Sequence, residues 1–387
     1  MKFNFDLVID RSGTYSIKHD PSSRGMPEDV LPMWVADMDF QAPPCVTEAL
    51  ENRVRHGIYG YSMPDTEYYD IVQGWFERRF GWKTEKEWIV QTPGVVNSIY
   101  IAIRALTEPG DGVVIQQPVY HPFMYAIRDT GRRIINNGLV YDAGCYSIDF
   151  DDFEEKLKNA RLFILCSPHN PISRVWARDE LFRMGEICLR HGVTVISDEI
   201  HQDFVYPGNR HFMFATLDKR FADITVTCTS PSKTFNLAGI QLSNTFIPNR
   251  ELRGRFAKEY RSCGLGGPGV MGIAACKAAY EGGAEWLEEL LLYLSGNFAL
   301  VREFLHTRLP EIGLIEPEGT YLAWLDFTKL GFPAQELDDL IRDKAKLWLN
   351  GGAMFGEGGA GFQRMNIACP RPIIHEGLAR LEAAFGN

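Results

Sequence analysis

Four short runs of apolar and β-branched residues recur through the middle of the chain and constrain its fold more than any other feature. They cover residues 112–115, 161–166, 192–197 and 223–228, and each ends in a polar or proline-containing loop. Helical patterns separate them over residues 97–106, 123–130 and 178–191. Continuous apolar strands that alternate with helices predict an α/β domain with a mostly parallel sheet covered on both faces.

The pattern changes near residue 281, where leucine-rich helical spacing replaces this alternation. The sequence there predicts helices over 286–309, 334–346 and 374–385, and strands over 320–327 and 363–369. This mixture is typical of a smaller α+β domain. We therefore expect a large domain over residues 49–280 and a small domain built from residues 1–48 and 281–387.

The composition restricts the class of protein. Hydrophobic residues make up 45% and charged residues 23% of the 387, as in ordinary globular proteins. The formal net charge is −10 without a basic stripe, which argues against a nucleic-acid partner. No apolar run reaches membrane-spanning length, and the first ten residues lack the apolar core of a signal peptide. We expect a cytoplasmic protein with no membrane association.

The eight cysteines predict free thiols rather than a disulfide framework. None belongs to a C-x-x-C pair, and several lie in apolar runs, so we expect buried thiols in a reducing compartment and no metal site. The cysteines are Cys45, Cys145, Cys166, Cys188, Cys228, Cys263, Cys276 and Cys369.

Two charged residues stand where predicted strands end, which is where ligands gather in parallel sheets. Lys233 follows the run 223–228 among hydroxyl side chains and has no other charge nearby. A lysine is usually a solvated surface residue, but this setting also suits one with a lowered pKa that forms a Schiff base. Asp198 follows the run 192–197. It could cap a helix, or it could pair with the ring nitrogen of pyridoxal phosphate (PLP). The PLP ring acts as an electron sink only when that nitrogen is protonated, so it needs such a partner.

Three other turns carry candidate binding residues. Asn170 follows the run 161–166 and could shape a turn or donate a hydrogen bond to a phenolate-like oxygen. Gly94 precedes a predicted helix whose first N–H groups favour a phosphate. Tyr120 follows the run 112–115 and could stack on a planar ring. Each feature alone is ambiguous, but together they place an anion-binding turn, an aromatic ring, Asn, Asp and Lys in that order beside strand ends.

Two glycine-rich segments match the G-x-G-x-x-G pattern of dinucleotide-binding proteins. They are residues 264–269 and 356–361. The first follows a charged helical stretch, and the second runs into a predicted strand. A dinucleotide fingerprint needs a strand before it and a helix after it, so both segments are expected to be loops.

These motifs together resemble the class I and II aminotransferase family of fold-type I PLP-dependent enzymes, over nearly the whole chain. Four segments resemble its cystathionine β-lyase (C–S lyase) branch in particular. They are Trp34–Phe40, His169–Pro171 with Arg174–Trp176, Ser197–His201 and Pro231–Gly239. The resemblance implies a PLP-dependent lyase that cleaves L-cystathionine or related S-substituted cysteines to a thiol, pyruvate and ammonia.

The resemblance also implies how PLP would be held. Lys233 would bind the cofactor and then move the Cα proton of the substrate, while Asp198 would pair with the pyridine nitrogen. Tyr120 would stack on the ring. Asn170, helped by His201, would bind the ring oxygen O3′.

Further roles implied by the resemblance concern the phosphate and the substrate. The phosphate ligands would be Gly94, Val95, Val96, Ser230 and Ser232. Arg364 would clamp the substrate α-carboxylate, and Asn170, Ala36 and Tyr61 would add substrate contacts. Tyr61 would also reach the phosphate of the neighbouring subunit, which makes a homodimer necessary for a complete site.

Two positions depart from the family pattern, and the reaction type stays open. Gln241 stands where many family aminotransferases carry a phosphate-binding arginine, and Ser173 replaces a usual glycine. An aminotransferase that moves an amino group between an amino acid and a 2-keto acid is the alternative, because the lysine chemistry is shared. A purely regulatory protein is disfavoured by the complete set of site residues.

Overall fold

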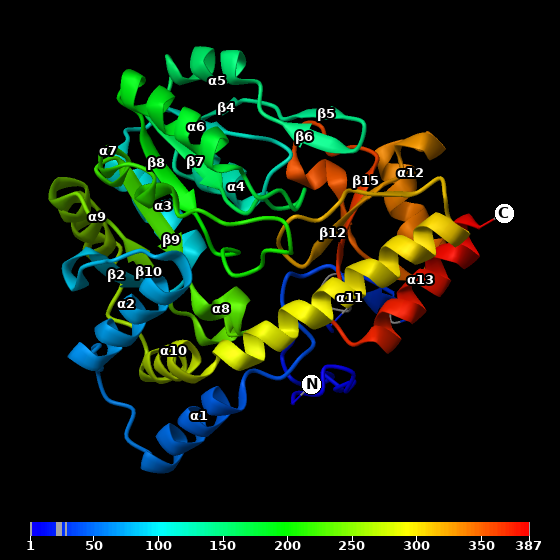
Figure 1. Ribbon diagram of the computed structural model, residues 1–387, viewed down its shortest axis with the longest axis horizontal. Helices are drawn as coiled ribbons and strands as arrows, with labels where there is room; N and C mark the ends of the chain where they lie inside the picture. Colours follow the sequence, from blue (N-terminus) through cyan, green and yellow to red (C-terminus); the bar gives the residue numbers. More distant parts are fainter. Residues whose placement is uncertain (1, 21–24, 28, 387) are drawn as a thin grey trace.

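A seven-stranded sheet forms the centre of the computed structural model, which describes residues 2–20, 25–27 and 29–386 (Figure 1). The strand order is β2-β10-β9-β8-β7-β3-β4, and β10 alone is antiparallel to its neighbours. The strands are Ile89–Thr92 (β2), Gly112–Ile115 (β3), Arg133–Asn136 (β4), Leu162–Cys166 (β7), Thr194–Asp198 (β8), Thr225–Thr229 (β9) and Ser243–Phe246 (β10). The mostly parallel sheet expected from the sequence is confirmed.

Apolar side chains alternate between the two faces of this sheet. Val113 and Ile115 pack into one core cluster and Val114 into another, and all three are fully buried. The first cluster includes residues of α3 (Val95–Leu106), α4 (Pro122–Asp129) and α9 (Arg250–Ser262). The second includes residues of α5 (Phe150–Leu157), α6 (Arg178–His191) and α7 (Lys219–Ala222). Burial on both faces explains why β3, β7, β8 and β9 were visible as continuous apolar runs.

Strands β2, β10 and β4 were not predicted from the sequence. In β2 and β10 polar side chains replace the apolar run, yet they are buried because they satisfy one another. Thr92 Oγ1 lies 2.5 Å from Ser243 Oγ, and Tyr68 donates a hydrogen bond of 2.7 Å to Asn244 Oδ1. Hydropathy alone does not show such pairs, because it takes no account of the partner strand.

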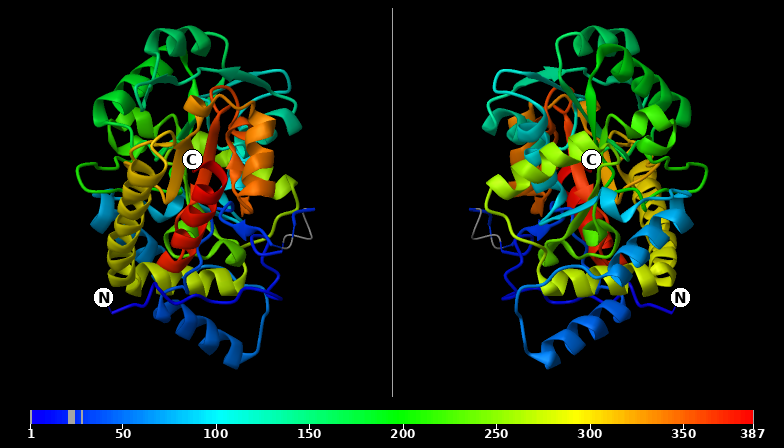
Figure 2. Two further views of the ribbon diagram at one scale, coloured as in Figure 1. Left: turned by 90° about the vertical axis from the view of Figure 1, so that its right-hand side faces the viewer. Right: turned by 90° about the vertical axis from the view of Figure 1, so that its left-hand side faces the viewer.

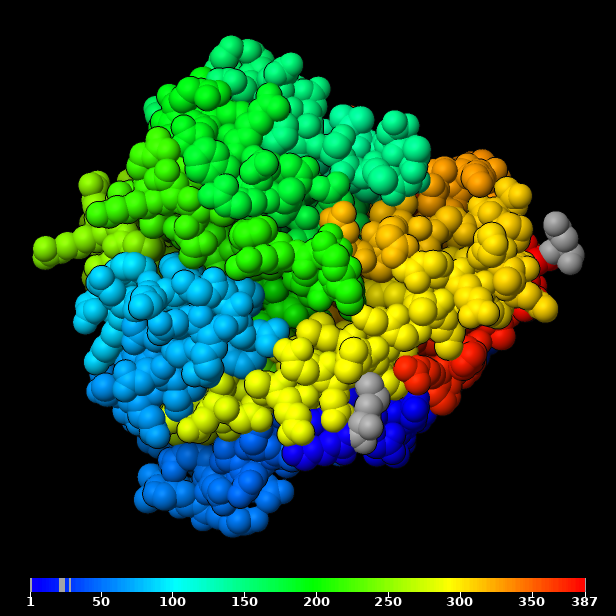
Figure 3. All heavy atoms as spheres, in the orientation of Figure 1, coloured from blue at the N-terminus to red at the C-terminus, as the bar shows by residue number. Residues whose placement is uncertain are grey.

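The C-terminal part contains a four-stranded antiparallel sheet flanked by long helices. Its strand order is β11-β12-β15-β14. The elements are β11 (Gly313–Leu314), β12 (Leu322–Asp326), α12 (Ala334–Asp339), β14 (Asn350–Gly351), β15 (Phe362–Asn366) and α13 (Arg371–Phe385). Helix α11 (Ala284–Arg308) runs beside α13 (Figure 2) and along the surface towards the N-terminal helices (Figure 3).

The predicted C-terminal elements are confirmed in type, with two corrections. In the segment expected to be one helix over 334–346, the α-helix ends at Asp339, and a π-helical turn, Leu340–Lys344, follows it. The strand expected over 363–369 ends at Asn366, whose side chain accepts the N–H of Ala368 and turns the chain. Both glycine-rich segments are loops: 264–269 connects α9 to α10 (Val270–Gly282), and 356–361 lies directly before β15.

The N-terminal segment joins the C-terminal part. Strand β1 (Leu31–Pro32) pairs in parallel with β13 (Leu347–Trp348), and Asp39 N donates to Ala368 O at 2.9 Å. The domain limits at 48/49 and 280/281 stay a prediction.

The remaining elements are α1 (Pro44–His56), α2 (Thr66–Phe80), the hairpin β5 (Val140–Asp142) with β6 (Cys145–Ser147), and α8 (Pro231–Thr234). Among the described helices, none has the length and apolar character needed to cross a membrane.

Candidate active site

One cavity lies at the carboxyl ends of β7, β8 and β9, beside the first turn of α3. Its free space is about 740 Å³, including its mouth. Of the residues predicted for the site, the cavity is lined by Ala36, Gly94, Val95, Val96, Tyr120, Asn170, Asp198, His201, Ser230, Ser232 and Lys233. It is also lined by Pro93, Cys166, Ile200, Ala238, Gln241 and Leu242, for which no role was predicted. Residues far apart in the sequence therefore meet at one edge of the sheet.

Lys233 reaches the cavity from the short helix α8, which follows β9 directly. Ser230 caps this helix by accepting the N–H of Ser232. Lys233 Nζ donates a hydrogen bond of 2.5 Å to the carbonyl oxygen of Ala36. Desolvation in the cavity lowers the pKa of Lys233 to about 8, although the carboxylate of Asp37 opposes the shift. The amine can therefore lose and regain a proton near neutral pH.

Asp198 ends β8 and is only 3% exposed. Its Oδ1 accepts the N–H of Ile200 at 3.1 Å. Burial raises the pKa of Asp198 to about 7, while that hydrogen bond and the charge of Lys233 act in the opposite direction. A cation placed against this carboxylate would stabilise its charged form, as a protonated ring nitrogen would.

Three side chains around Asp198 can contact a planar ring. Tyr120 packs edge-on against Phe123, and burial raises its pKa to about 12, so its hydroxyl stays protonated. Asn170 Oδ1 accepts from Arg364 Nη1 at 2.9 Å, which leaves the amide nitrogen of Asn170 as its donor group. Burial, with the nearby charges of Lys233 and Arg364, holds the pKa of His201 well below its ordinary value, so its imidazole is neutral.

The opposite end of the cavity can hold an anion. Gly94 precedes α3, so the backbone N–H groups of Val95 and Val96 belong to the first turn of a helix, where phosphates bind. Ser230 lines the cavity, and its hydroxyl donates to the Leu242 carbonyl at 2.7 Å. Ser232 and Gln241 line the same cavity, and Gln241 adds no charge to it.

Arg364 lies on β15 and is buried behind Asn170 rather than in the cavity lining. Its Nη2 donates to Trp34 O at 3.0 Å and to Asn350 Oδ1 at 2.5 Å, and its guanidinium lies over the ring of Phe355. Burial lowers its pKa to about 10, so it stays charged at neutral pH. Its buried Nε has no partner among the described residues, and one N–H of Nη1 is also unused, which leaves two donors for a carboxylate.

Tyr61 lies outside this cavity, on the loop between α1 and α2. Its side chain is fully exposed in the single chain. Ile58, Tyr59 and Met63 on the same loop are also exposed, at 67%, 57% and 81%. The single chain therefore does not bring Tyr61 to its own site.

Ser173, one of the two departures from the family pattern, adopts the left-handed backbone conformation that glycine favours, with φ 58°. Its hydroxyl donates to Leu322 O at 2.6 Å and lies 2.9 Å from Thr320 Oγ1. These buried hydrogen bonds offset the backbone strain, so the turn after Asn170 keeps its shape without glycine.

Sequence reasoning missed Tyr321 and Asn236. Tyr321 donates its hydroxyl proton to Ala36 O at 2.8 Å, the oxygen that also accepts from Lys233. Asn236 binds the backbone at Met38. Tyr321 stands in no motif, whereas Asn236 was visible in the Pro231–Gly239 segment without an assigned partner.

The comparisons with known proteins extend over the whole chain. The family described as aminotransferase class I and II matches residues 28–381. Cystathionine β-lyase PatB of Bacillus subtilis (strain 168) is 47% identical over 386 residues, which cover 99% of this chain and 100% of that protein. The structure of cystalysin from Treponema denticola, which contains pyridoxal 5′-phosphate, matches with a TM-score of 0.96 and 38% identity over 99% of each chain. The PLP-bound C–S lyase from Staphylococcus hominis matches with a TM-score of 0.93 and 33% identity over 100% of this chain and 98% of that one.

Proposed function

Because the chain belongs to the class I and II aminotransferase family, we propose that it is a PLP-dependent C–S β-lyase. Its substrates are L-cystathionine or related S-substituted cysteines, and its products are a thiol, pyruvate and ammonia, which places it in sulfur amino-acid metabolism. The full-length likeness to a cystathionine β-lyase carries this proposal. It also favours the lyase over the aminotransferase alternative.

The donor set of the cavity fits PLP. Asp198 is a buried carboxylate that needs a cation, as the protonated ring nitrogen supplies. His201 Nδ1 is buried without a partner among the described residues, so a ring oxygen would satisfy it. The first turn of α3 offers N–H groups to a phosphate. Lys233, with a lowered pKa, is the nucleophile that such a cofactor requires.

Each residue then has a proposed task. Lys233 binds the cofactor and later takes the proton from the substrate Cα. Arg364 holds the substrate α-carboxylate, which orients the Cα–H bond towards the Lys233 amine. Tyr120 holds the ring plane, and Asn170 with His201 binds the ring oxygen. When bound, PLP supplies an electron sink for the charge left on Cα.

The substrate preference can be tested with two amino acids that differ in one atom. S-methyl-L-cysteine and O-methyl-L-serine should be offered separately to the purified holoenzyme. We expect equal amounts of methanethiol and pyruvate from S-methyl-L-cysteine. Release of methanol and pyruvate from O-methyl-L-serine should be at least about 100-fold slower, because a thiolate leaves far more readily than an alkoxide. Consumption of an added 2-keto acid without thiol release would instead identify an aminotransferase.

The homodimer is part of the same proposal. The loop with Ile58, Tyr59, Tyr61 and Met63 exposes a group of large apolar side chains, which is typical of an interface. A second copy of the chain would cover this loop and receive Tyr61 at its phosphate. Each site would then need residues from both subunits.

Subunit complementation checks this arrangement. Tyr61→Ala and Lys233→Ala are each expected to be nearly inactive as homodimers. After unfolding and refolding of an equal mixture, about a quarter of all sites should combine an intact Lys233 with an intact Tyr61 of the other subunit. Recovery of about that share of the wild-type rate supports a shared site. A mixture as inactive as its two components contradicts it.

Two other features belong to this proposal. All eight cysteines are free thiols, which suits a reducing compartment such as the cytoplasm. We also propose that the large domain spans residues 49–280 and that residues 1–48 and 281–387 form the small domain.

A further inference from the structure

The segment Trp34–Phe40, here called the strap, contacts both charged groups of the proposed mechanism. Lys233 Nζ donates to the carbonyl oxygen of Ala36 at 2.5 Å, and Arg364 Nη2 donates to that of Trp34 at 3.0 Å. The two carbonyls are two residues apart in the strap. The strap therefore connects the amine that would move a proton with the guanidinium that would hold the carboxylate.

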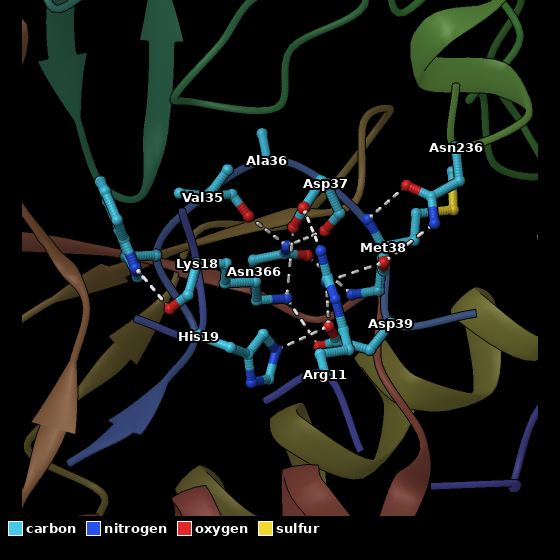
Figure 4. Close-up of polar contacts among 12 residues, drawn as sticks. Arg11, Lys18, His19, Val35, Ala36, Asp37, Met38, Asp39, Asn236 and Asn366 are labelled. Atoms are coloured by element: carbon cyan, nitrogen blue, oxygen red, sulfur yellow. Dashed lines mark hydrogen bonds and ion pairs between the residues drawn. The ribbon is translucent and has the colours of Figure 1, made fainter. Parts of the chain in front are cut away.

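Two asparagines fasten the strap, one from each side (Figure 4). Asn236 follows Lys233 by three residues. Its Oδ1 accepts the N–H of Met38 at 3.0 Å, and its Nδ2 donates to the carbonyls of Met38 and Phe40 at 2.9 and 2.8 Å. Asn366 follows Arg364 by two residues, and its Nδ2 donates to the carbonyls of Val35 and Asp37, both at 2.6 Å.

Ion pairs hold the acidic side chains of the strap (Figure 4). Arg11 binds Asp37 at 2.8 Å and Asp39 at 2.6 Å, and Lys18 binds Asp39 at 2.6 Å. The Lys18 side chain is only 1% exposed, so these carboxylates offset the cost of burying it. Although burial opposes the shift, the charge of Lys18 and the hydrogen bonds from His19 and Lys18 hold the pKa of Asp39 well below its ordinary value. Asp39 therefore stays ionised, and the ion pairs fix the strap at Asp37 and Asp39.

We propose that the strap, fastened by Asn236 and Asn366, positions the free Lys233 amine for proton transfer through the carbonyl of Ala36. This inference rests on the proposed lyase function. When the Lys233 amine is not bound to the cofactor, one of its N–H groups is directed at Ala36 O, which orients its lone pair. The amine nitrogen then takes the Cα proton: the Cα–H bond breaks, an N–H bond forms, and the electron pair stays with the substrate and its cofactor.

Tyr321 supports this role for Ala36. Its hydroxyl donates to the same carbonyl oxygen at 2.8 Å, from the residue directly before β12. The Ala36 oxygen is therefore held by a buried group of the C-terminal part while it accepts from Lys233. Asn236 and Asn366 act through this oxygen and the strap, so they are positioning residues rather than catalytic ones.

Two substitutions at Asn236 separate positioning from folding. Asn236 has φ 59°, in the left-handed region, so alanine would add strain to the loss of hydrogen bonds. Asn236→Gly removes all three hydrogen bonds to the strap and tolerates this φ. Asn236→Asp keeps the shape and the acceptor for Met38 N–H but loses both donated bonds. The matched control is Asn249→Gly, because Asn249 also makes three hydrogen bonds to backbone groups, at Glu251, Leu252 and Asp223, away from the cavity.

Two measurements decide the question. Hydrogen–deuterium exchange on the cofactor-free protein should show the Met38 amide exchanging at least about tenfold faster in Asn236→Gly than in the wild type. In the holoenzyme, kcat should fall by about 100-fold while KM changes less than about threefold, as expected when a reacting group is misplaced by about 1 Å. Asn236→Asp should show a smaller loss of kcat, and Asn249→Gly none.

Other results would overturn the inference. One such result is that Asn236→Gly keeps the wild-type kcat although its Met38 amide exchanges faster. Another is that Asn249→Gly loses as much kcat as Asn236→Gly does. If the wild type itself releases no thiol from any S-substituted cysteine, the proposed function fails instead, and the exchange measurement still reports whether Asn236 holds the strap.

Discussion

Lys233→Ala is expected to lower kcat for C–S cleavage by about 10⁴-fold or more, the largest effect of any single substitution in this chain. The substitution removes the amine that binds the cofactor and the group that takes the Cα proton. Among the described residues, no other lysine lines the cavity, so none of them offers a second amine there. The measurement is the rate of pyruvate and thiol release at saturating substrate.

Two controls make this result specific. Lys83→Ala removes an amine whose side chain is 84% exposed, and it should leave the rate unchanged. Borohydride reduction of the wild type should fix the cofactor on the peptide that contains Lys233, as mass spectrometry can show. In Lys233→Ala, added methylamine should restore part of the rate, because a small amine can enter the space and accept the proton. A variant that keeps a tenth of the wild-type rate would contradict the role of Lys233.

The central site residues could be predicted because each stands at a strand end. Lys233, Asp198 and Asn170 follow buried strands whose apolar runs are continuous in the sequence. Parallel strands bring their carboxyl ends to one edge, so the position along the chain was enough to predict that these side chains meet. The residues of the cavity confirm that they do.

The strap could not be predicted in the same way. Its branch-specific sequence was recognised, but its contacts join residues far apart in the chain. Asn236 meets Met38 across 198 positions, and Lys233 meets Ala36 across 197. Backbone carbonyls accept these bonds, and they carry no sequence signal. Strands β2 and β10 were missed for a related reason, because their buried polar side chains depend on partners that only the folded sheet provides.

The predicted phosphate site shows how local bonds can change a role. Ser230 follows a strand, as the other site residues do, and lines the cavity as expected. Its hydroxyl, however, donates to Leu242 and accepts from Ser232 N–H. The sequence shows a hydroxyl at the correct place but not whether its proton is already used by the backbone.

Asp198→Asn is expected to lower kcat by about 10³-fold, the size of loss that follows removal of one preorganised electrostatic partner. The side chain keeps its shape and can still accept the N–H of Ile200, so the local structure should persist. What it loses is the charge that keeps the cofactor ring nitrogen protonated. Pyruvate release should therefore fall while Lys233 still binds the cofactor, which the reduced Lys233 peptide reports.

The same substitution should raise the stability of the cofactor-free protein at neutral and alkaline pH. The folded-state pKa of Asp198 is about 7, above its ordinary value of 3.8. The protonated Asp198 carboxyl therefore makes its full contribution to the free energy of unfolding below about pH 4. That contribution is lost as the pH rises to about 7, because the carboxyl ionises in the unfolded chain before it ionises in the folded protein. Asparagine removes this loss, so Asp198→Asn should unfold at a higher temperature than the wild type at pH 8 and at a similar temperature at pH 4.

Asp203→Asn is the matched control for this stability effect. Asp203 is buried as deeply, but it pairs with Arg79 at 2.7 Å and accepts from Thr234 at 2.8 Å. Burial raises the pKa of Asp203 as well, but its charge also pairs with Arg79, so Asp203→Asn should gain less stability at pH 8 than Asp198→Asn does. A larger gain of stability at Asp198 than at Asp203 would show that Asp198 is held in the cavity for a ligand and not for the fold. A loss of stability in Asp198→Asn at pH 8 would contradict this interpretation, because it would mean that the carboxylate already has a stabilising partner in the protein.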